Sequence, residues 1–416
     1  MSSITRIEPS EPAGPEDTRP RLLLVAYKIA AGAGSEDGSG YHIAAGLARS
    51  CRVTLITRIN NARALAGDEA LADVELLGVD VPRPLGSFKR GGRGIILYYY
   101  LWQVTVGLRV RRLLKRRRFD VIHQLNFHTD WAPHFLPRAA DRRLVWGPIA
   151  HHRVAPRSYF APGDAAGEAK EAVRAVIKRC FWRLDPFLRS AIRRSDVILY
   201  ANDDLAPPFR RARRKISFRP YAGSFTRGEP APDSVFRVLF VGRLVALKGP
   251  VPALRAFARL RRELGDSAAA ELVFVGDGPQ RDVLERLVGE LGCSECVRFA
   301  GWVDQEELHE HYRRASVFLF PSVEAQGLVV AEALAHGIPV ICTESTGPAF
   351  LAGPAAVAAA PGPGLVDRLA AGLSEAHTRF RNPDGRARAA AAARARYDTF
   401  LDWPVAVEAI LAAYRG

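Results

Sequence analysis

Short apolar segments alternate with longer helical segments along this chain, and the alternation runs in two separate series. The first series has strand-like segments at 21–29, 52–58, 119–125, 142–148 and 195–202, with helical stretches at 41–49, 97–117 and 166–193. The second has strand-like segments at 236–244, 271–278, 296–301 and 315–320, with helical stretches at 250–263, 280–291 and 305–314. Strands that alternate with helices form parallel sheets with crossover helices. The sequence therefore predicts two doubly wound α/β domains, whose ligands bind beyond the carboxyl ends of the strands.

Composition places the boundaries of these domains. Residues 1–20 are rich in Pro, Glu and Ser and are expected to form a disordered leader. An N-terminal Rossmann-like domain then covers 21–218, a linker dense in Pro and Gly covers 219–234, and a C-terminal Rossmann-like domain covers 235–398. The final segment, 399–416, contains an amphipathic helix that can pack on either domain, including across to the N-terminal one.

The apolar and cysteine patterns bear on the compartment. No window offers roughly eighteen uninterrupted apolar residues, so no transmembrane helix is expected. No apolar segment with a small-residue cleavage site follows Met1, which argues against export. Five scattered cysteines fit a reducing cytoplasm. Cys293 and Cys296 form a CxxC pair without a second pair or a histidine cluster, so we expect neither a metal site nor a bound cofactor.

Positive charge is abundant and unevenly spread. The net charge is +15, which favours an acidic partner. No acidic residue lies between Asp80 and Asp120, and this interval carries the basic residues Arg83, Lys89, Arg90, Arg93, Arg109, Arg111, Arg112, Lys115, Arg116, Arg117 and Arg118. It also carries the segment LYYYLW at 97–102. Aromatic and basic side chains together suit an anionic membrane interface, and a solvated helix face is the alternative. No nucleic-acid-binding motif accompanies the charge, so nucleic acid is not an expected partner.

The segment PSVEAQGLVVAEALAHGIPV, at 321–340, places two carboxylates at a strand-to-helix junction. Glu324 falls in the loop after the strand at 315–320, and Glu332 lies about two turns into the following helix. Gly327 lies at the start of that helix, where free N–H groups and the helix dipole favour an anion and where glycine permits close approach. The pattern suggests a site for a polar, phosphorylated ligand.

Two further loops of the second half follow strands. The segment VGRLVALKG places Arg243 just after a strand and Lys248 at the start of a helix, an arrangement that suits a diphosphate. The segment VGDGP, at 275–279, lacks the complete G-x-G-x-x-G pattern, so NAD binding is not predicted there.

Together, GRLxxxKG, VGDGP, RFAGW and PSxxExxGLxxxEAxxxGxPV resemble, in order and spacing, the retaining glycosyltransferases of family 4, which have the GT-B fold. The resemblance runs from Phe236 to Val340. It implies two Rossmann-like doubly wound domains that face each other across a cleft, with a nucleotide-sugar donor bound to the C-terminal domain.

The resemblance also implies roles for individual residues. The donor diphosphate would be held by Arg243 and Lys248, the sugar by Glu324 as a catalytic residue, the ribose hydroxyls by Glu332, and the sugar or phosphate by the backbone near Gly327 and Leu328. Gln326 stands where the family usually has an aromatic residue, a departure that concerns the sugar pocket.

The first half resembles the family more loosely. GAGSEDGSGY, at 32–41, resembles a glycine-rich loop that faces the acceptor or the donor phosphates, with Gly34, Ser35 and Gly38 as candidate contacts. FDVIHQLNFHTDW, at 119–131, resembles the strand end that carries the family's active-site histidine. His123 is therefore the first candidate for a catalytic histidine and His128 the second, with His151 and His152 of VWGPIAHHR as weaker candidates.

The resemblance implies a metal-independent hexosyltransferase that moves a sugar from a nucleoside-diphosphate sugar to a hydroxyl of a glycan or lipid-linked acceptor, in cell-surface polysaccharide or glycolipid biosynthesis. It is expected in the cytoplasm, with the anionic inner face of the plasma membrane as a further candidate partner. Two alternatives stay open. One is a nucleotide-sugar epimerase or a phosphorylase with the same two-domain plan. The other is a non-enzymatic basic protein that binds membrane or nucleic acid.

Overall fold

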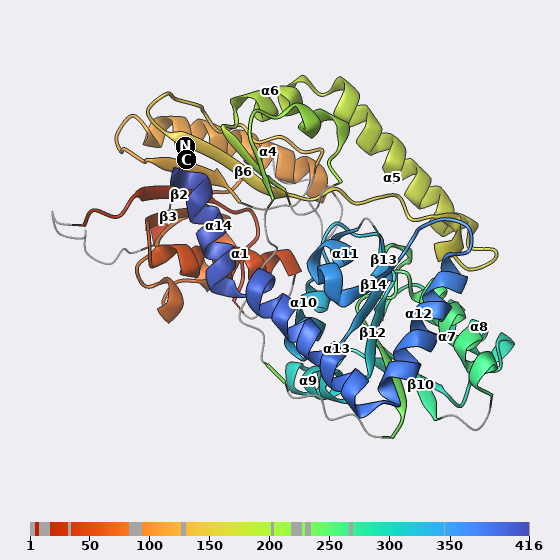
Figure 1. Ribbon diagram of the computed structural model, residues 1–416. Helices are drawn as coiled ribbons and strands as arrows, with labels where there is room; N and C mark the ends of the chain where they lie inside the picture. Colours follow the sequence, from red (N-terminus) through yellow and green to blue (C-terminus); the bar gives the residue numbers. More distant parts are fainter. Residues whose placement is uncertain are drawn as a thin grey trace.

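Two mostly parallel sheets, each covered by helices on both faces, make up the computed structural model of the protein (Figure 1). The structure describes residues 5–7, 17–31, 35–82, 94–125, 130–200, 204–217, 227–228, 234–265, 269–344 and 346–415. Two doubly wound α/β domains were predicted, and this prediction is confirmed. The linker expected at 219–234 falls largely outside the described residues.

The N-terminal sheet has the order β1-β4-β3-β2-β5-β6-β7-β8. Its strands are β1 (Thr5–Ile7), β2 (Arg21–Val25), β3 (Arg52–Thr57), β4 (Glu75–Gly78), β5 (Val121–Gln124), β6 (Arg143–Ile149), β7 (Val197–Tyr200) and β8 (Lys215–Ser217). Its helices are α1 (Ser35–Ala48), α2 (Ile59–Ala64), α4 (Ile95–Leu113), α5 (Ala165–Leu184) and α6 (Pro186–Arg194), with a short 3₁₀ turn, η2, at Arg157–Tyr159. All neighbouring strands are parallel except β1 and β4.

The C-terminal sheet has the order β11-β10-β9-β12-β13-β14 and is parallel throughout. Its strands are β9 (Phe236–Val241), β10 (Ala270–Val275), β11 (Val297–Gly301), β12 (Val317–Phe320), β13 (Val340–Thr343) and β14 (Ala356–Ala359). Its helices are α7 (Pro250–Leu264), α8 (Arg281–Glu290), α9 (Gln305–Arg314), α10 (Leu328–Ala335), α11 (Gly347–Ala352), α12 (Leu365–Phe380) and α13 (Pro383–Arg396), and the 3₁₀ turn η4 covers Ala246–Lys248. The strand order reverses between β9 and β12, and ligands of such sheets bind at this switch point.

Burial explains why the central strands were recognisable in the sequence. Every residue of β9 and of β12 is buried, because helices cover both faces of a parallel sheet. Such strands read as continuous apolar runs, FRVLFV and VFLF here, rather than as alternating patterns. The ends of these two strands therefore sit on a rigid base.

The last helix, α14 (Trp403–Arg415), leaves the C-terminal domain and packs on the N-terminal one (Figure 1). Ile410, Leu411 and Tyr414 belong to the hydrophobic core beneath α1 and the N-terminal sheet. Trp403 covers Gly46 of α1 so closely that a Cβ at Gly46 would lie 1.9 Å from Trp403 Cζ2. The chain thus crosses between the domains twice.

This contact predicts that Gly46→Ala destabilises the protein. An added methyl group would force the Trp403 ring or α14 to shift, and overpacking of this kind costs about 1–3 kcal/mol. We expect the melting temperature to fall by several degrees. Gly289→Ala is the matched control, because a Cβ there would meet no atom within 4 Å. An equal melting temperature for both variants would contradict the close packing of α14 on α1.

Three expectations need correction. Residues 5–7, expected in a disordered leader, form β1 and pair with β4 in antiparallel register. The single helix expected at 166–193 is broken at Asp185, because Pro186 cannot continue the preceding helix and Asp185 instead caps α6 by accepting from the N–H groups of Phe187 and Leu188.

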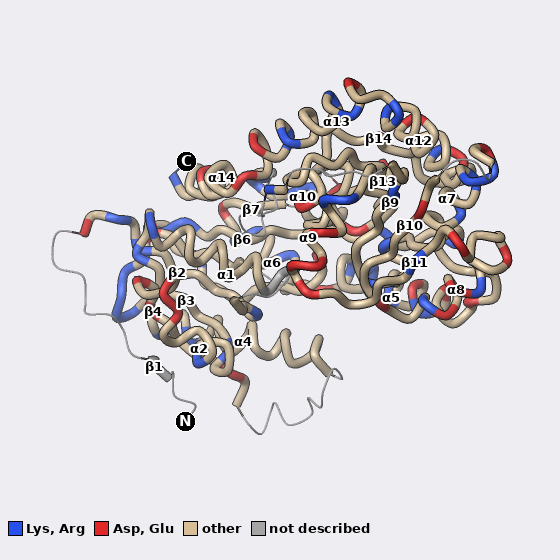
Figure 2. The backbone as a smooth tube through the Cα atoms, turned by 90° about the horizontal axis from the view of Figure 1, so that it is seen from below, with Lys and Arg blue, Asp and Glu red and all other residues tan. Residues whose placement is uncertain are grey.

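The third correction concerns the aromatic segment of the basic interval. Tyr98, Tyr99 and Trp102 of α4 are buried, and Trp102 Nε1 donates to the carbonyl of Val79 at 2.7 Å. These aromatic side chains belong to the core of the N-terminal domain and cannot contact a membrane. Figure 2 shows Lys and Arg distributed over both domains rather than on this segment alone. Among the described helices, none is both long and apolar enough to cross a bilayer.

Candidate functional site

The predicted donor-binding residues gather at the carboxyl ends of β9 and β12. The loop after β9 carries Arg243 and Lys248, and the loop after β12 carries Glu324 and Gly327. Figure 1 shows α10 and α11, which follow β12 and β13, at the end of the C-terminal sheet that faces the N-terminal domain. The site therefore lies at the switch point of the strand order, between the two domains.

Glycines allow the loops of this site to pack backbone against backbone. Gly249 has a φ of +74°, and a Cβ there would lie 2.5 Å from the carbonyl oxygen of Pro321. A Cβ at Gly347, the first residue of α11, would lie 2.2 Å from the carbonyl carbon of Ala325. The amide of Gly347 also donates to the carbonyl of Glu324 at 3.0 Å. The position of Glu324 thus depends on close contacts that no larger residue would permit.

Lys248 and Glu324 form an ion pair. Lys248 Nζ lies 3.1 Å from both Glu324 Oε1 and Oε2, and it also lies 5.1 Å from the centroid of the Phe320 ring. The Lys248 and Glu324 side chains are only 20% and 12% exposed. A partly buried pair is screened less by salt than a surface pair, so each charge fixes the other's position. The structure brings together two residues that the sequence placed in one site from segments 76 positions apart.

Glu332 occupies the second turn of α10 and is hydrogen bonded to a residue that the sequence analysis missed. Tyr312 OH donates to Glu332 Oε2 at 2.8 Å. Burial raises the pKa of Glu332, while the Tyr312 hydrogen bond and the nearby Lys248 charge act in the opposite direction. Tyr312 is itself fully buried at the end of α9. Its bond orients the carboxylate and leaves Oε1 as a further acceptor.

The Arg243 side chain, unlike that of Lys248, is not held by an ion pair with a described residue. It is exposed. The neighbouring Leu244 is buried, and its amide donates to the carbonyl of Asp277 at 3.0 Å. The backbone of the loop is therefore fixed while the guanidinium can bind an anion in solution.

The start of α10 supplies a second electropositive element. Gly327 is buried at the N-cap with φ 158° and ψ 63°, a conformation that favours glycine. Leu328 begins α10, whose first N–H groups have no partners within the helix and carry the positive end of the dipole. Gln326, the atypical residue before this glycine, is partly exposed.

A segment of the N-terminal half contacts these loops directly. His152 Nδ1 accepts from the amide of Ala325 at 3.2 Å, next to Glu324. Tyr159 is fully buried within the C-terminal core, where its hydroxyl lies 3.0 Å from Thr343 Oγ1 and its carbonyl accepts from Gln280 at 3.2 Å. The segment 150–160 therefore joins the N-terminal sheet to the donor side of the cleft.

His151, beside His152, is held by a buried acid. Its Nδ1 lies 2.5 Å from Asp130 Oδ2, and Lys178 Nζ lies 3.3 Å from Asp130 Oδ1. Asp130 is 1% exposed. Burial lowers the pKa of Lys178, and the Asp130 charge opposes this change. The two histidines that the sequence ranked as weaker candidates thus lie on the segment that reaches the donor loops.

His123 is buried between the N-terminal sheet and α14. It is fully buried, Nε2 donates to the Gly147 carbonyl at 2.8 Å, and Nδ1 accepts from the Tyr414 hydroxyl at 2.7 Å. Both ring nitrogens are therefore hydrogen bonded, Nε2 within the N-terminal sheet and Nδ1 to α14. This geometry gives His123 a structural role, and its catalytic role stays a prediction that these contacts do not support.

The remaining candidates of the first half contribute little to the described site. His128 and Gly34 lie outside the described residues. Ser35 is the first residue of α1, and Gly38 is buried within that helix.

The burial of His123 predicts a pH-dependent stability. Burial lowers the pKa of His123 to about 4, and the hydrogen bond to Gly147 opposes this change. Because the folded-state pKa lies below the unfolded value, the stabilisation is complete above pH 6.5 and is lost as the pH falls from 6.5 to about 4. The loss is on the order of 3 kcal/mol.

Replacement of His123 by Gln removes this titration. We expect the melting temperature of His123→Gln to be lower than that of the wild type at pH 8 and to change less between pH 7 and pH 5. Parallel melting curves for the two proteins across this range would show that His123 is not buried in its neutral form. The comparison with the wild type is needed because His134 is also buried with a pKa lowered to about 3.

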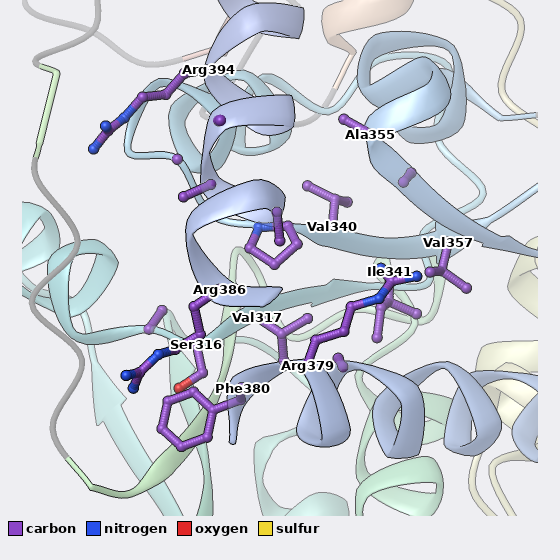
Figure 3. Close-up of a pocket in the computed structure, with 18 of the residues that line it drawn as sticks. Ser316, Val317, Val340, Ile341, Ala355, Val357, Arg379, Phe380, Arg386 and Arg394 are labelled. Atoms are coloured by element: carbon purple, nitrogen blue, oxygen red, sulfur yellow. The ribbon is translucent and has the colours of Figure 1, made fainter. Parts of the chain in front are cut away.

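A separate cavity of about 730 Å³ lies at the other end of the C-terminal sheet, where its strands begin (Figure 3). It is lined by the first residues of β12, β13 and β14 and by α12 and α13, including Val317, Val340, Val357, Arg379 and Arg386. In Figure 3 the guanidinium groups of Arg386 and Arg379 point in different directions. The cavity contains none of the predicted donor-binding residues, so it is distinct from the candidate site.

Comparisons with known proteins identify the class of protein that this chain resembles. Residues 225–396 match the family described as "Glycosyl transferases group 1". A GDP-mannose-dependent alpha-(1-6)-phosphatidylinositol monomannoside mannosyltransferase of Mycolicibacterium smegmatis is 32% identical over 198 residues, which are 40% of this chain and 50% of that protein. A D-inositol 3-phosphate glycosyltransferase of Corynebacterium jeikeium is 42% identical over 113 residues, 26% of this chain and 27% of that protein. The chain spans about half the length of the first of these relatives.

Solved structures resemble nearly the whole chain. Sucrose-phosphate synthase of Thermosynechococcus elongatus has a TM-score of 0.63 at 17% identity, over 95% of this chain and 98% of that one. WaaG, a glycosyltransferase involved in lipopolysaccharide biosynthesis, has a TM-score of 0.60 at 20% identity, over 94% and 98% of the two chains. These comparisons confirm the resemblance to glycosyltransferases of the GT-B fold.

Proposed function

We propose that this chain transfers a sugar from a nucleoside-diphosphate sugar to an acceptor hydroxyl. It has the GT-B fold, and its residues 225–396 match the family of glycosyl transferases group 1. The observation that carries the proposal is the Lys248–Glu324 ion pair at the switch point, beside the start of α10 and the exposed Arg243. This arrangement combines cations for a diphosphate with a carboxylate for sugar hydroxyls in one partly buried site.

The leaving group sets the task of the basic residues. When the bond between the sugar anomeric carbon and the diphosphate oxygen breaks, negative charge develops on the diphosphate. Lys248 and the N–H groups at the start of α10 would stabilise that charge from fixed positions, and the exposed Arg243 would add a second cation once the diphosphate is bound. These groups supply positive charge without a metal ion, so we propose metal-independent transfer of the family 4 type.

The two carboxylates would have separate roles. Glu324, held at 3.1 Å from Lys248 Nζ, would accept hydrogen bonds from the sugar hydroxyls and keep the anomeric carbon beside the acceptor. Glu332, oriented by Tyr312, would accept from the ribose hydroxyls with its free oxygen. Neither carboxylate is assigned the role of general acid or base.

We propose that the anomeric configuration is retained. The acceptor hydroxyl would attack the anomeric carbon on the face from which the diphosphate departs. The new bond joins the acceptor oxygen to that carbon, and the hydroxyl proton passes to the departing phosphate oxygen. The segment 150–160, which contacts Ala325 through His152, would form the acceptor side of the cleft.

The acceptor is proposed to be a glycan or a lipid-linked molecule, and the pathway cell-surface polysaccharide or glycolipid biosynthesis. The names of two relatives support this class, since one acts on a phosphatidylinositol monomannoside and the other is involved in lipopolysaccharide biosynthesis. The chain would act in the cytoplasm, at the inner face of the plasma membrane.

A screen of donors tests the proposal. Purified protein is incubated with UDP-, GDP-, ADP- and CMP-sugars and a lipid extract, and release of the free nucleotide is followed together with the sugar product. We expect acceptor-dependent release of a nucleoside diphosphate from one donor and a glycoside of unchanged anomeric configuration. Conversion of the donor to its epimer would instead identify an epimerase. If neither turnover nor donor binding is observed, a non-enzymatic binding protein becomes the better account.

A further inference from the structure

The longest helix of the N-terminal domain, α5, exposes its apolar side chains. Val173, Val176, Ile177 and Leu184 are 58%, 56%, 48% and 75% exposed, and Cys180 is exposed as well. At 3.6 residues per turn, Val173, Ile177, Cys180 and Leu184 fall within roughly 60° of the helix circumference. Phe187, at the start of α6, extends this row and is 52% exposed. We call these six residues the α5 stripe.

The opposite side of α5 is polar and attaches the helix to the protein. Lys178 Nζ donates to the carbonyl of His152 at 3.1 Å and pairs with Asp130. Glu171 Oε1 accepts from the amide of Ala155 at 3.1 Å, and Trp182 Nε1 donates to the carbonyl of Asp130 at 2.9 Å. A surface helix of a soluble protein normally buries its apolar side and exposes its polar side. In α5 this arrangement is reversed.

The borders of the α5 stripe are cationic. Lys170 lies on one side of it and Arg179 and Arg183 lie on the other, all three exposed and none in an ion pair with another described residue. The only acidic residue between Lys170 and Leu184 is Glu171, which faces inward and pairs with Arg174. The other acidic residue of α5, Glu168, lies in its first turn and forms an ion pair with Arg157. An apolar row with basic borders is the pattern of helices that lie in the interface of an anionic membrane.

We propose that the α5 stripe docks the protein onto an anionic lipid bilayer. The apolar side chains enter the boundary between headgroups and acyl chains, and Lys170, Arg179 and Arg183 contact anionic headgroups. A second copy of the chain fits this surface less well, because an isologous contact through the stripe places the two sets of basic borders together without any acidic counterpart. Charge complementarity therefore favours lipid.

Docking through α5 also has a direction. Figure 1 shows α5 at the periphery of the molecule, running from α6 in the N-terminal domain towards the C-terminal domain. Its inner side holds the carbonyls of Asp130 and His152, and His152 contacts the donor loop at Ala325. A bilayer bound to the outer side of α5 is therefore separated from the acceptor side of the cleft by one helix. That this bilayer carries the acceptor rests on the proposed function, whereas the docking itself does not.

Vesicle flotation tests the docking. The wild type is expected to float with vesicles of phosphatidylcholine and phosphatidylglycerol at low salt, to float less at high salt, and not to float with phosphatidylcholine alone. The variant Val173→Ser/Ile177→Ser/Leu184→Ser is expected to lose at least ten-fold in bound fraction. The matched control is Leu97→Ser/Leu108→Ser on α4, which also removes exposed apolar side chains, 55% and 52% exposed, from the same domain. It should bind as the wild type does.

Cys180 gives a local readout of the same event. It is the exposed cysteine, while Cys51, Cys293 and Cys342 are buried and Cys296 is partly buried. An environment-sensitive fluorophore on Cys180 is expected to shift to shorter wavelength when anionic vesicles are added.

Three outcomes would overturn the docking proposal. One is a wild type that does not float with anionic vesicles at low salt, and another is a serine variant that floats equally well. The third is a dimer that the serine substitutions dissociate without any effect of vesicles. Donor binding measured without vesicles should be the same in the wild type and the serine variant. If neither protein binds a donor, that result counts against the proposed function and not against the docking.

Discussion

Replacing Lys248 by Met is expected to lower kcat/KM for sugar transfer by about 10²–10³-fold, the usual loss when one preorganised group at a developing anion is removed. Lys248 Nζ is fixed at 3.1 Å from both oxygens of Glu324, in a pair that is less than one quarter exposed. The methionine keeps the length and apolar contacts of the side chain but not its charge. The variant should fold normally, because Lys248 lies in a short 3₁₀ turn rather than in the core.

The control for this variant is Arg313→Met. Arg313 forms an ion pair with Glu310 on α9, and the two side chains are 47% and 52% exposed. Arg313→Met therefore removes one cation from the same domain at a residue that has no role in the site. Its kcat/KM should stay within a few-fold of the wild type. Turnover of Lys248→Met close to that of Arg313→Met would remove Lys248 from the donor site.

The second large effect is expected at Gly347, which is remote from the chemistry in sequence but packs on the Glu324 loop. A Cβ at this position would lie 2.2 Å from the carbonyl carbon and oxygen of Ala325 and 2.4 Å from the amide nitrogen of Gln326. Because these are backbone atoms, no rotamer change can relieve the contact, and the loop that carries Glu324 must move. A displacement of about 1 Å at a catalytic group can cost on the order of 100-fold in rate. We therefore expect Gly347→Ala to lose about 10²-fold in kcat.

Gly289→Ala again serves as the control, because α8 leaves open space around that glycine. Both proteins should melt within a few degrees of the wild type, since the Glu324 loop is only one small part of the C-terminal core. Full activity of Gly347→Ala would mean that the Glu324 loop does not need its present position. A crystal structure of the active variant would then be expected to show the loop displaced.

Elements whose structure is determined by residues close together in the sequence could be predicted best. β9 and β12 could be predicted because strands buried on both faces are continuous apolar runs, and α7 and α9 because their apolar residues recur with helical spacing. β4, β8 and β14 were missed because their sequences, ELLG, KIS and AVAA, are not continuous runs of large apolar residues. The break between α5 and α6 has a local signal, Asp185 followed by Pro186, that the helical pattern outweighed.

The candidate site divides in the same way. Lys248 and Glu324 could be predicted from their motifs, and the structure places them in contact. The bonds from Tyr312 to Glu332 and from Ala325 to His152 could not, because they join segments 20 and 173 residues apart. The structural contacts of His123 could not be predicted for the same physical reason. Its strand-end position suggests a ligand site, but Tyr414, 291 residues later, occupies its ring nitrogen, and no local pattern encodes that contact.

Binding of the leaving group tests the central claim most directly. Isothermal titration of UDP, GDP and ADP into the wild type, Lys248→Met and Arg313→Met requires neither the acceptor nor the membrane. The account predicts that one nucleoside diphosphate binds the wild type and Arg313→Met with similar affinity and binds Lys248→Met at least ten-fold more weakly. Equal affinity of that nucleotide for all three proteins, or binding of none of them to the wild type, would contradict a donor site built on Lys248 and Glu324.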